Sequence, residues 1–473
     1  MPTDPRRLRD DAPLLHAWLR FHEQAPTPFT IPGHKQRHDL VGDVVAGDVP
    51  LYGGLDTVKL SGGLVAEAER RAARLWGAGR CRFSVGGATH ANQAAVLAVA
   101  RPGDQVVVSR SLHRSMLLAL VLGGLRPVWV SPDVDPATGL PLGVRPAVLA
   151  AALRENPGVT AVFVGDPSYV GTLGDVRGLA DTAHARGVPL VVDAAWAAHL
   201  GHHPDLPPHA LALGADVVVT SAHKTLPAWS QAALVLAQTD RVDPARLDAG
   251  IEATATTSPA GAILASIDAS RALLERDGEA LLGDAVALVA RARSRLAEVD
   301  GLVVLHGAHV DPLKLVLLLP GTGADGNAVE ADLLAAGLPV ESADRDLLVP
   351  LVSLADTAQS LDALVDALLD SLARHCGRPR PVLPAETYRV SPVQAMTPRE
   401  AFFADAEALP LPEAVGRVCT ELVAPYPPGV PVLAPGEEIT VAALDVLEAA
   451  RGAGVRIAYA ADPSLATLRV VRR

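Results

Sequence analysis

A lysine and an aspartate, each placed where a strand-like run ends, are the residues best suited to chemistry in this sequence. Lys224 closes the segment Ser221-Ala-His-Lys, which follows the apolar run at 216–220, and Asp193 follows the apolar run at 189–192. A half-buried lysine can lose its proton and act as an amine nucleophile. A buried carboxylate that faces a pyridine nitrogen keeps that nitrogen protonated, so that the ring draws electrons. The pair therefore indicates amine chemistry on a pyridine cofactor.

Lysine is scarce in this chain, which makes each one informative. Of 41 basic residues only four are lysines: Lys35, Lys59, Lys224 and Lys314. Arginine effectively cannot lose its proton, so a position that keeps lysine indicates a need for a neutral amine. The alternatives are a surface lysine on a loop and an aspartate that caps a helix. One strand–helix–strand interval separates Asp193 from Lys224, which predicts that they lie at neighbouring strand ends.

Two further segments are candidates for binding a cofactor. Residues 86–90, Gly-Gly-Ala-Thr-His, lie between a strand-like run at 81–85 and a helix expected at 91–100. Glycines let the backbone approach a phosphate, and the N–H groups at a helix start can bind it; the alternative is an ordinary turn. His113, in Ser111-Leu-His-Arg-Ser, has a flat ring that could stack on an aromatic cofactor, or it is an ordinary loop histidine.

Strand and helix patterns alternate between about residues 65 and 240. An amphipathic helix is expected at 64–76, and helices at 115–122 and 176–186 separate several valine-rich runs. Such runs, bounded by Gly, Pro or Asp, are typical of buried parallel strands, and they lie at 105–109, 127–131, 160–164, 189–192, 216–220 and 232–236. The alternation predicts an α/β layer with a mostly parallel sheet, whose ligands bind beyond the carboxyl ends of the strands.

The pattern changes after about residue 280. A helix at 281–299, a helix at 359–374 and strands at 302–305, 313–319 and 347–352 predict a smaller α+β unit. Twelve of the 39 prolines follow between Pro379 and Pro435, which indicates an extended segment leading into a small C-terminal domain. We therefore expect a large domain at 1–275, an α+β domain at 276–378 and a C-terminal domain at 379–473.

Composition excludes several classes of partner. The formal net charge is −12 and no long basic run occurs, which argues against nucleic acid or an anionic membrane surface. No apolar run reaches the length of a membrane span, and the N-terminus has no apolar signal core. Three widely spaced cysteines form neither a metal-ligand pattern nor a disulfide framework. We expect no metal site and a cytoplasmic location.

In their order along the chain, these segments resemble the Orn/Lys/Arg decarboxylase family, bacterial fold-type I enzymes that use pyridoxal 5'-phosphate (PLP). The similar segments include Thr30-Ile-Pro-Gly-His-Lys, the glycine segment at 86–92, Asp166-Pro-Ser-Tyr-Val-Gly, Asp193-Ala-Ala-Trp-Ala-Ala-His, Ser221-Ala-His-Lys, Thr257-Ser-Pro, Pro398-Arg-Glu-Ala-Phe-Phe and Pro425-Tyr-Pro-Pro-Gly-Val-Pro. The resemblance implies an α/β fold, with a fold-type I large domain of mostly parallel sheet, a smaller α+β domain and a small C-terminal domain.

The resemblance also implies a role for each site residue. Lys224 would attach PLP, Asp193 would pair with the ring nitrogen and His113 would stack on the ring. The remaining cofactor contacts would come from His223, Ser221, Ala88, Thr89, Ala195 and Trp196. Thr257 would reach the phosphate of the partner subunit, so the active unit would be a homodimer, and Glu341 would bind the distal amine of the substrate.

The expected reaction is decarboxylation of lysine, ornithine or arginine to the corresponding diamine or agmatine. Transamination on the same fold is one alternative, and a non-catalytic regulatory relative is another. The family's glutamate after the aspartate is Ala194 here, its phosphate-loop Ser or Thr is Ala88, and a family lysine is Arg114. The chain begins almost at the Pro-Gly-His-Lys element, which implies a short form without the N-terminal wing domain of larger relatives.

Overall fold

The computed structural model describes residues 5–24, 28–51, 54–56, 63–381, 390, 392–426, 431–452 and 454–473. Lys59 and residues 427–430 of the proline-rich segment lie outside the described residues. The chain forms two compact units. Unit 1 comprises residues 1–99 and 191–282, and unit 2 comprises residues 100–190 and 283–473. The three-domain division expected from the sequence stays a prediction.

The main sheet has seven strands in the order β1-β7-β6-β5-β4-β2-β3. In chain order they are β1 (Arg80–Ser84), β2 (Gln105–Ser109), β3 (Arg126–Val130), β4 (Val159–Gly165), β5 (Leu190–Asp193), β6 (Val217–Ser221) and β7 (Ala233–Ala237). The pairs β2–β3, β2–β4 and β5–β6 are parallel, whereas β7 is antiparallel to both β1 and β6. Each predicted strand is found within about one residue of its expected bounds, so the prediction of a mostly parallel α/β sheet is confirmed.

Helices α3 (Leu64–Trp76), α4 (Gly87–Val99), α9 (Pro244–Thr254) and the first part of α10 (Gly261–Leu296) belong to unit 1. The helix expected at 64–76 is confirmed as α3. Gly77 ends it in a left-handed conformation, with its N–H donating to carbonyls of the last turn. The helix expected at 281–299 is wrong at its start, because α10 begins twenty residues earlier. Small and polar residues and Gly278 dilute the apolar period there, and tertiary packing decides the structure instead.

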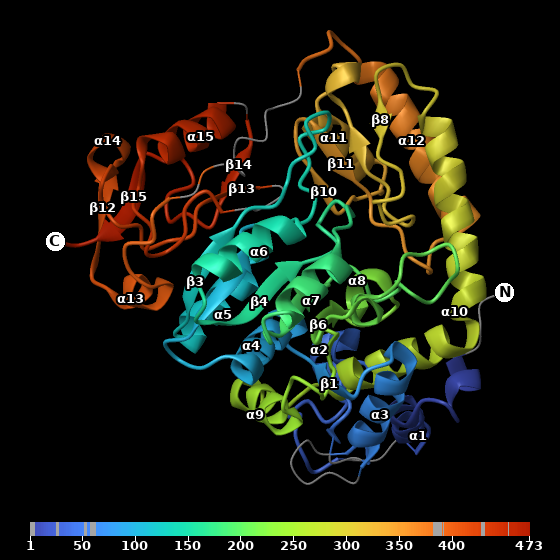
Figure 1. Ribbon diagram of the computed structural model, residues 1–473. Helices are drawn as coiled ribbons and strands as arrows, with labels where there is room; N and C mark the ends of the chain where they lie inside the picture. The colour runs from blue at the N-terminus through green and yellow to red at the C-terminus, as the bar shows by residue number, and fades with distance from the viewer. Residues whose placement is uncertain are drawn as a thin grey trace. The chain divides into compact units, whose positions relative to one another are not determined.

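In unit 2, α5 (Arg114–Gly123) joins β2 to β3, α6 (Pro146–Glu155) joins β3 to β4, and α7 (Val176–His184) follows β4. Helices α6 and α7 pack side by side (Figure 1). A second, antiparallel sheet has the order β10-β11-β9-β8. Its strands are β8 (Val303–Val304), β9 (Leu317–Leu318), β10 (Ser342–Ala343) and β11 (Leu347–Val349), accompanied by α11 (Gly326–Ala335) and α12 (Ala358–His375). The α+β pattern expected after residue 280 is therefore present, with shorter strands than predicted.

The last part of unit 2, residues 390 to 473 as far as described, has a core of its own; we call it the C-terminal part. It contains α13 (Pro398–Phe403), β12 (Ala406–Pro410), α14 (Leu411–Ala414), β13 (Ala424–Tyr426), α15 (Val441–Gly452), β14 (Arg456–Ala458) and β15 (Thr467–Val471). Cys419, Val423 and Leu447 are fully buried in this core. Within the described residues, no helix is long and apolar enough to cross a membrane.

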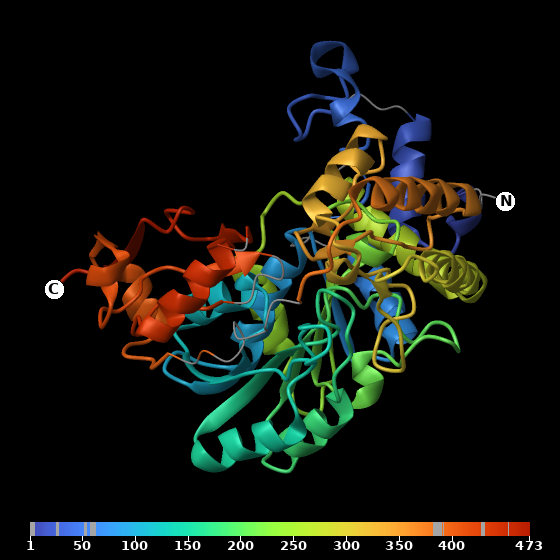
Figure 2. The ribbon, with the colours of Figure 1, turned by 90° about the horizontal axis from the view of Figure 1, so that it is seen from above.

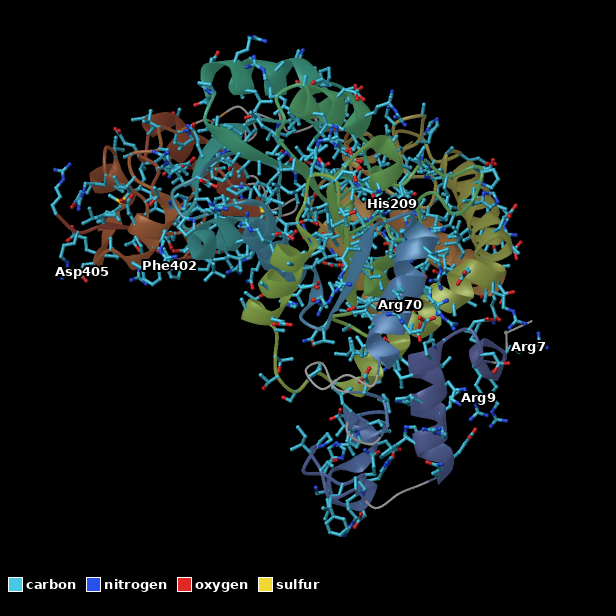
Figure 3. All side chains as sticks on the ribbon, turned by 60° about the horizontal axis from the view of Figure 1, so that its bottom comes forward. Arg7, Arg9, Arg70, His209, Phe402 and Asp405 are labelled. Carbon is cyan, nitrogen blue, oxygen red and sulfur yellow. The ribbon has the colours of Figure 1, made fainter. Side chains whose placement is uncertain are left out.

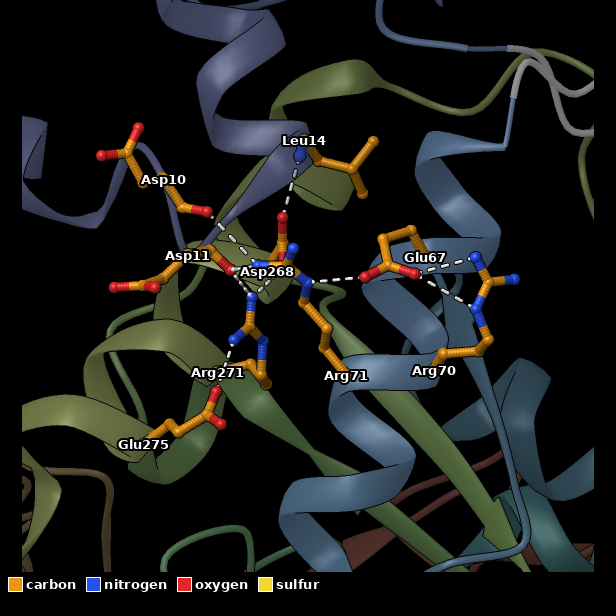
Figure 4. A network of polar contacts seen from close by, with 9 residues as sticks. All are labelled: Asp10, Asp11, Leu14, Glu67, Arg70, Arg71, Asp268, Arg271 and Glu275. Carbon is orange, nitrogen blue, oxygen red and sulfur yellow. Dashed lines mark hydrogen bonds and ion pairs between the residues drawn. The ribbon is translucent and has the colours of Figure 1, made fainter.

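The N-terminus of unit 1 is fastened by a buried ion pair. Helix α1 (Pro13–Gln24) packs beside α3 (Figures 1 and 3). The Asp268 carboxylate accepts a hydrogen bond from the backbone N–H of Leu14 at 2.8 Å and from Arg271 at 2.6 Å. The side chains of this ion pair are fully buried, and Arg271 also donates to the Asp11 carbonyl (Figure 4). Burial raises the pKa of Asp268, against the opposing effect of the Arg271 charge. Each charge of the Asp268–Arg271 pair is therefore stable in this buried position only because the other is present.

Removal of the Asp268 carboxylate is expected to destabilise unit 1 strongly. Asp268→Ala leaves the Arg271 guanidinium buried without its carboxylate, a change that costs about 3–5 kcal/mol in comparable pairs. The shift of the first unfolding transition in urea measures the effect. Glu275→Gln is the matched control, because Glu275 contacts the same guanidinium from a half-exposed position. We expect it to change stability by less than about 1 kcal/mol. Equal losses in the two variants would contradict the role of the buried pair.

Candidate active site

The ends of β5 and β6 lie side by side in unit 1. The two strands are parallel, with Asp193 opposite Val219. Beyond the strands, the backbone N–H of Ser221 donates to the carbonyl of Ala195 at 3.4 Å. Asp193 and the short helix α8 (Ala222–Thr225), which carries Lys224, therefore follow neighbouring strand ends at one edge of the sheet. This is the placement that the spacing of the two residues predicts.

Both carboxylate oxygens of Asp193 are held by hydrogen bonds. Oδ2 accepts from the Asn92 side-chain amide at 2.8 Å, and Oδ1 accepts from the backbone N–H of Ala195 at 3.2 Å. Asp193 is 7% exposed and Asn92 is fully buried. The helix-cap alternative does not describe this carboxylate, which is oriented by an amide from α4. No role for Asn92 is expected from the sequence, although the polar pair Asn92-Gln93 on an alanine-rich helix is a usable signal.

The Lys224 ammonium lies over an aromatic ring. Its Nζ is 4.1 Å from the centroid of the Trp196 ring, and Trp196 is buried. The negative face of an indole attracts a cation at this distance. Lys224 itself is half-buried, so the surface-lysine alternative does not fit the structure. The amine thus lies inside unit 1, against a residue three positions beyond Asp193.

Helices α4 and α8 begin against the same turn. The backbone N–H of Gly87 donates to the Gln231 carbonyl at 2.8 Å, and that of Ala222 donates to the Ala232 carbonyl at 3.0 Å. His223 Nδ1 also contacts the Ala232 carbonyl, at 2.8 Å, and must carry the proton there because a carbonyl only accepts. The glycine segment and the lysine segment are therefore hydrogen-bonded to the consecutive residues Gln231 and Ala232.

The glycine segment differs from the prediction at its helix start. Helix α4 begins at Gly87 and not at 91, so Ala88 and Thr89 lie in its first turn, half-buried and exposed respectively. Gly87 has a φ of +69°, and a side chain at Gly86 would approach His90 Cβ to 2.8 Å. Both glycines are thus needed for this turn. The first-turn N–H groups of a helix have no partners within the helix and can bind a phosphate.

One buried atom bears directly on whether unit 1 fits PLP. The Ser221 residue is fully buried, and its Oγ has no hydrogen-bond partner among the described residues. Leaving such a hydroxyl unpaired costs about 1–3 kcal/mol, which a phosphate oxygen would recover. Ser221 pairs with Ala233 at the start of β7, next to the turn that holds α4 and α8. Together with the Asp193 carboxylate and the Lys224 amine, these residues fit the phosphate, ring nitrogen and aldehyde of PLP.

Ala194, which replaces the family's glutamate, forms hydrogen bonds to β6 through its backbone. Ala194 is fully buried. Its N–H donates to the Val219 carbonyl at 2.8 Å, and its carbonyl accepts from the Thr220 hydroxyl at 2.9 Å. The sheet edge is therefore complete without a carboxylate at this position.

Thr257, His113 and Glu341 are all exposed residues, and only Thr257 belongs to the unit that carries Asp193 and Lys224. Thr257 is exposed, in the loop between α9 and α10 of unit 1. His113 belongs to unit 2, where it is the exposed N-cap of α5 and its Nδ1 accepts from the Ser115 backbone N–H at 3.2 Å. Glu341 also belongs to unit 2, where it is exposed directly before β10. Their roles stay predictions.

Family models match two parts of this chain. The family model described as Orn/Lys/Arg decarboxylase, major domain, matches residues 12–306, more than half of the chain. The chain belongs to the Orn/Lys/Arg decarboxylase family. The model of that family's C-terminal domain matches residues 382–456. The resemblance inferred from the ordered segments is thereby confirmed.

Three relatives named as decarboxylases cover between 82% and 98% of the chain. An arginine decarboxylase of Halalkalibacterium halodurans is 32% identical, with 98% of both chains covered. An arginine decarboxylase of Bacillus subtilis is 30% identical, also with 98% of both covered. A lysine decarboxylase of Pseudomonas aeruginosa is 26% identical over 82% of this chain and 67% of its own.

Solved structures support the fold. The Francisella novicida lysine decarboxylase matches with a TM-score of 0.82 at 20% identity, covering 98% of this chain and 82% of its own. An alanine–glyoxylate aminotransferase of Nostoc matches with a TM-score of 0.53 at 19% identity, covering 66% of this chain and 86% of its own. The fold-type I prediction is confirmed, and the same fold serves proteins with different names.

Proposed function

We propose that this chain is a PLP-dependent decarboxylase of a basic amino acid, with arginine as the first substrate to test. The observation that carries the proposal is the placement of the Lys224 amine over Trp196, at the strand end next to Asp193. Family membership narrows the reaction, and four relatives named arginine decarboxylase cover at least 90% of the chain. Agmatine and carbon dioxide would be the products from arginine.

The residues of unit 1 divide the work. When bound, PLP supplies an electron sink for the electron pair that carbon dioxide leaves behind. Lys224 would hold the cofactor through its Nζ, and the same amine can return a proton to the substrate Cα. Asp193, oriented by Asn92, keeps the ring nitrogen protonated.

Three groups near the ends of β5 and β6 in unit 1 could bind the phosphate of PLP. Ser221 offers its buried hydroxyl, and the first turn of α4 at Ala88 and Thr89 offers backbone N–H groups. His223 donates from Nδ1 to the Ala232 carbonyl, so it can donate to a phosphate only from Nε2, as the imidazolium. Ala195 and Trp196 complete the wall beside Asp193.

We further propose a cytoplasmic homodimer whose sites combine residues of both subunits. Thr257 is exposed in the single chain, as a residue that acts across an interface must be. The segment around α2 (His38–Val41) and η2 (Gly42–Val45) extends from the rest of unit 1 (Figure 2). It exposes Phe29 to 93% and Val44 to 81%, apolar surface that a second copy would cover. In the same proposal, His113 stacks on the ring and Glu341 binds the distal amine of the substrate.

A substrate panel tests the proposed reaction. The purified chain is incubated with PLP and with arginine, lysine or ornithine, and carbon dioxide, amine and keto acid are measured together. We expect carbon dioxide and agmatine in equal amounts from arginine. Keto acid without carbon dioxide would indicate a transaminase, and PLP binding without any product would indicate a non-catalytic relative. Preference for lysine or ornithine would retain the reaction and change the substrate.

A further inference from the structure

The segment that carries His113 is held by side-chain contacts with the C-terminal part. Residues 110–115 run from the end of β2 into the first turn of α5, with His113 as the cap of that helix. Two arginines frame the histidine, Arg110 three positions before it and Arg114 directly after it. Both arginine side chains bind groups of the C-terminal part, and all of these residues belong to unit 2.

Arg110 forms the first anchor. Its side chain is 1% exposed and donates to both carboxylate oxygens of Glu437, at 2.5 and 2.8 Å. It also donates to the carbonyls of Pro431 and Val432, at 3.1 and 2.9 Å. Glu437 is fully buried and accepts a further hydrogen bond from the Ala434 N–H.

A planar guanidinium with this many partners has one orientation. Two parallel hydrogen bonds to a carboxylate fix its plane as well as its position. Burying such a pair adds little net stability compared with apolar residues, because both charges lose their hydration. The gain from the Arg110–Glu437 pair is therefore a defined geometry for the backbone that leads to His113.

Arg114 forms the second anchor. Its guanidinium carbon lies 4.4 Å from the centroid of the Tyr459 ring, in the range of a cation–π contact. Tyr459 has a φ of +70°, a conformation that a bulky residue adopts at a cost of about 1–3 kcal/mol. The C-terminal part thus holds an unfavourable backbone conformation at the residue that meets Arg114. Arginine, whose flat face stacks well, replaces the family's lysine here.

The far end of α5 is fastened as well. Arg399 of α13 donates to the Leu122 carbonyl at 2.9 Å, in the last turn of α5. A cation at this end of a helix binds unpaired carbonyls and complements the helix dipole. The same helix α13 carries Phe402, which Figure 3 labels together with Asp405 on the C-terminal part. Helix α5 is therefore held near both ends by one part of the chain.

We propose that the C-terminal part is a positioning device for His113, with Arg110–Glu437 and Arg114–Tyr459 as its two anchors. The inference rests on the proposed function, in which the His113 ring stacks on the cofactor. Glu437 and Tyr459 are positioning residues and do not touch the reacting atoms. They set the height and tilt of a ring whose contact with a flat cofactor tolerates little displacement.

Tyr459 offers the sharpest test, because it is half-buried and its removal spares the buried ion pair. Tyr459→Leu removes the ring that Arg114 covers, and Tyr459→Phe keeps it. Misplacement of a contact by about 1 Å can cost up to ~10²-fold in rate, so we expect Tyr459→Leu to lower kcat roughly tenfold with little change in KM. The visible circular dichroism of the bound cofactor should weaken in parallel, and Tyr459→Phe should match the parent chain.

A measurement without cofactor accompanies the kinetics. Hydrogen exchange of the peptide covering residues 110–116 in the apo chain should quicken in Tyr459→Leu and stay unchanged in Tyr459→Phe. Glu407→Gln is the matched control, since it breaks the Arg417–Glu407 ion pair inside the C-terminal part, away from residues 110–115. Parent-like kcat, dichroism and exchange in Tyr459→Leu, or equal losses in Glu407→Gln, would overturn the proposal. A parent chain that neither binds PLP nor releases carbon dioxide would instead overturn the proposed function.

Discussion

Replacement of Lys224 by alanine is expected to remove turnover and the covalent link to PLP together. The loss should be on the order of 10⁴-fold or more, because the variant lacks both the attaching amine and the proton donor. Borohydride reduction followed by peptide mapping should tag residue 224 in the parent chain and leave the variant untagged. Carbon dioxide release measures the loss of rate in the same preparations.

Lys224→Arg separates the amine from its charge. Arginine keeps a cation that can cover the Trp196 ring, so the local packing of unit 1 should survive. It effectively cannot deprotonate, so it should be as inactive as the alanine variant. An active Lys224→Arg chain would contradict the assignment, because the position would then need only a positive charge.

Mixed dimers extend the same experiment to the subunit interface. Thr257→Asp places a negative charge where the proposal puts the phosphate of the partner subunit. A dimer of one Lys224→Ala chain and one Thr257→Asp chain then contains one site with both native residues. Two inactive homodimers should regain activity on mixing. Failure to regain it, with hybrid dimers present by native mass spectrometry, would refute a site shared between subunits.

The positions of Asp193 and Lys224 could be predicted because parallel strands impose a simple rule. Their carboxyl ends meet at one edge of the sheet, so polar residues after successive strands become neighbours. The orientation of β7 could not be predicted in the same way, since an apolar run has the same pattern in both directions. Yet the antiparallel pairing of β7 with β6 brings the turn at Gln231 and Ala232 beside the lysine segment.

Polar pairs between residues far apart in the chain could not be predicted from the sequence. Asn92 is 101 positions from Asp193, and Arg110 is 327 positions from Glu437. Neither spacing follows any period of a helix or strand, and each partner alone is an ordinary polar residue. The start of α4 differs from the expected residue 91 for a local reason: the glycines at 86 and 87 predict a turn before the helix, whereas Gly87 already begins it.

Replacement of Asp193 should separate cofactor binding from catalysis. Asp193→Ala keeps the Lys224 amine and the phosphate groups, so PLP should still bind. The rate should fall by on the order of 10²-fold or more, because a preorganised charge is lost at the ring nitrogen. Asp193→Asn, which keeps the shape and loses the charge, should lose nearly as much. Asn92→Ala removes one hydrogen bond to the carboxylate, and we expect a loss of roughly tenfold, equal to about 1.4 kcal/mol. Bound PLP and kcat are measured for each variant.

A cofactor analogue that lacks the ring nitrogen decides whether Asp193 acts through that atom. In the parent chain, the 1-deaza analogue of PLP should lower the rate to the level of Asp193→Ala with PLP. Combining the analogue with Asp193→Ala should add little, because the two changes remove the same interaction from its two sides. Losses that multiply would mean that the carboxylate acts elsewhere, for instance by shaping the turn at Ala195. A rate for Asp193→Asn within threefold of the parent would lead to the same conclusion without the analogue.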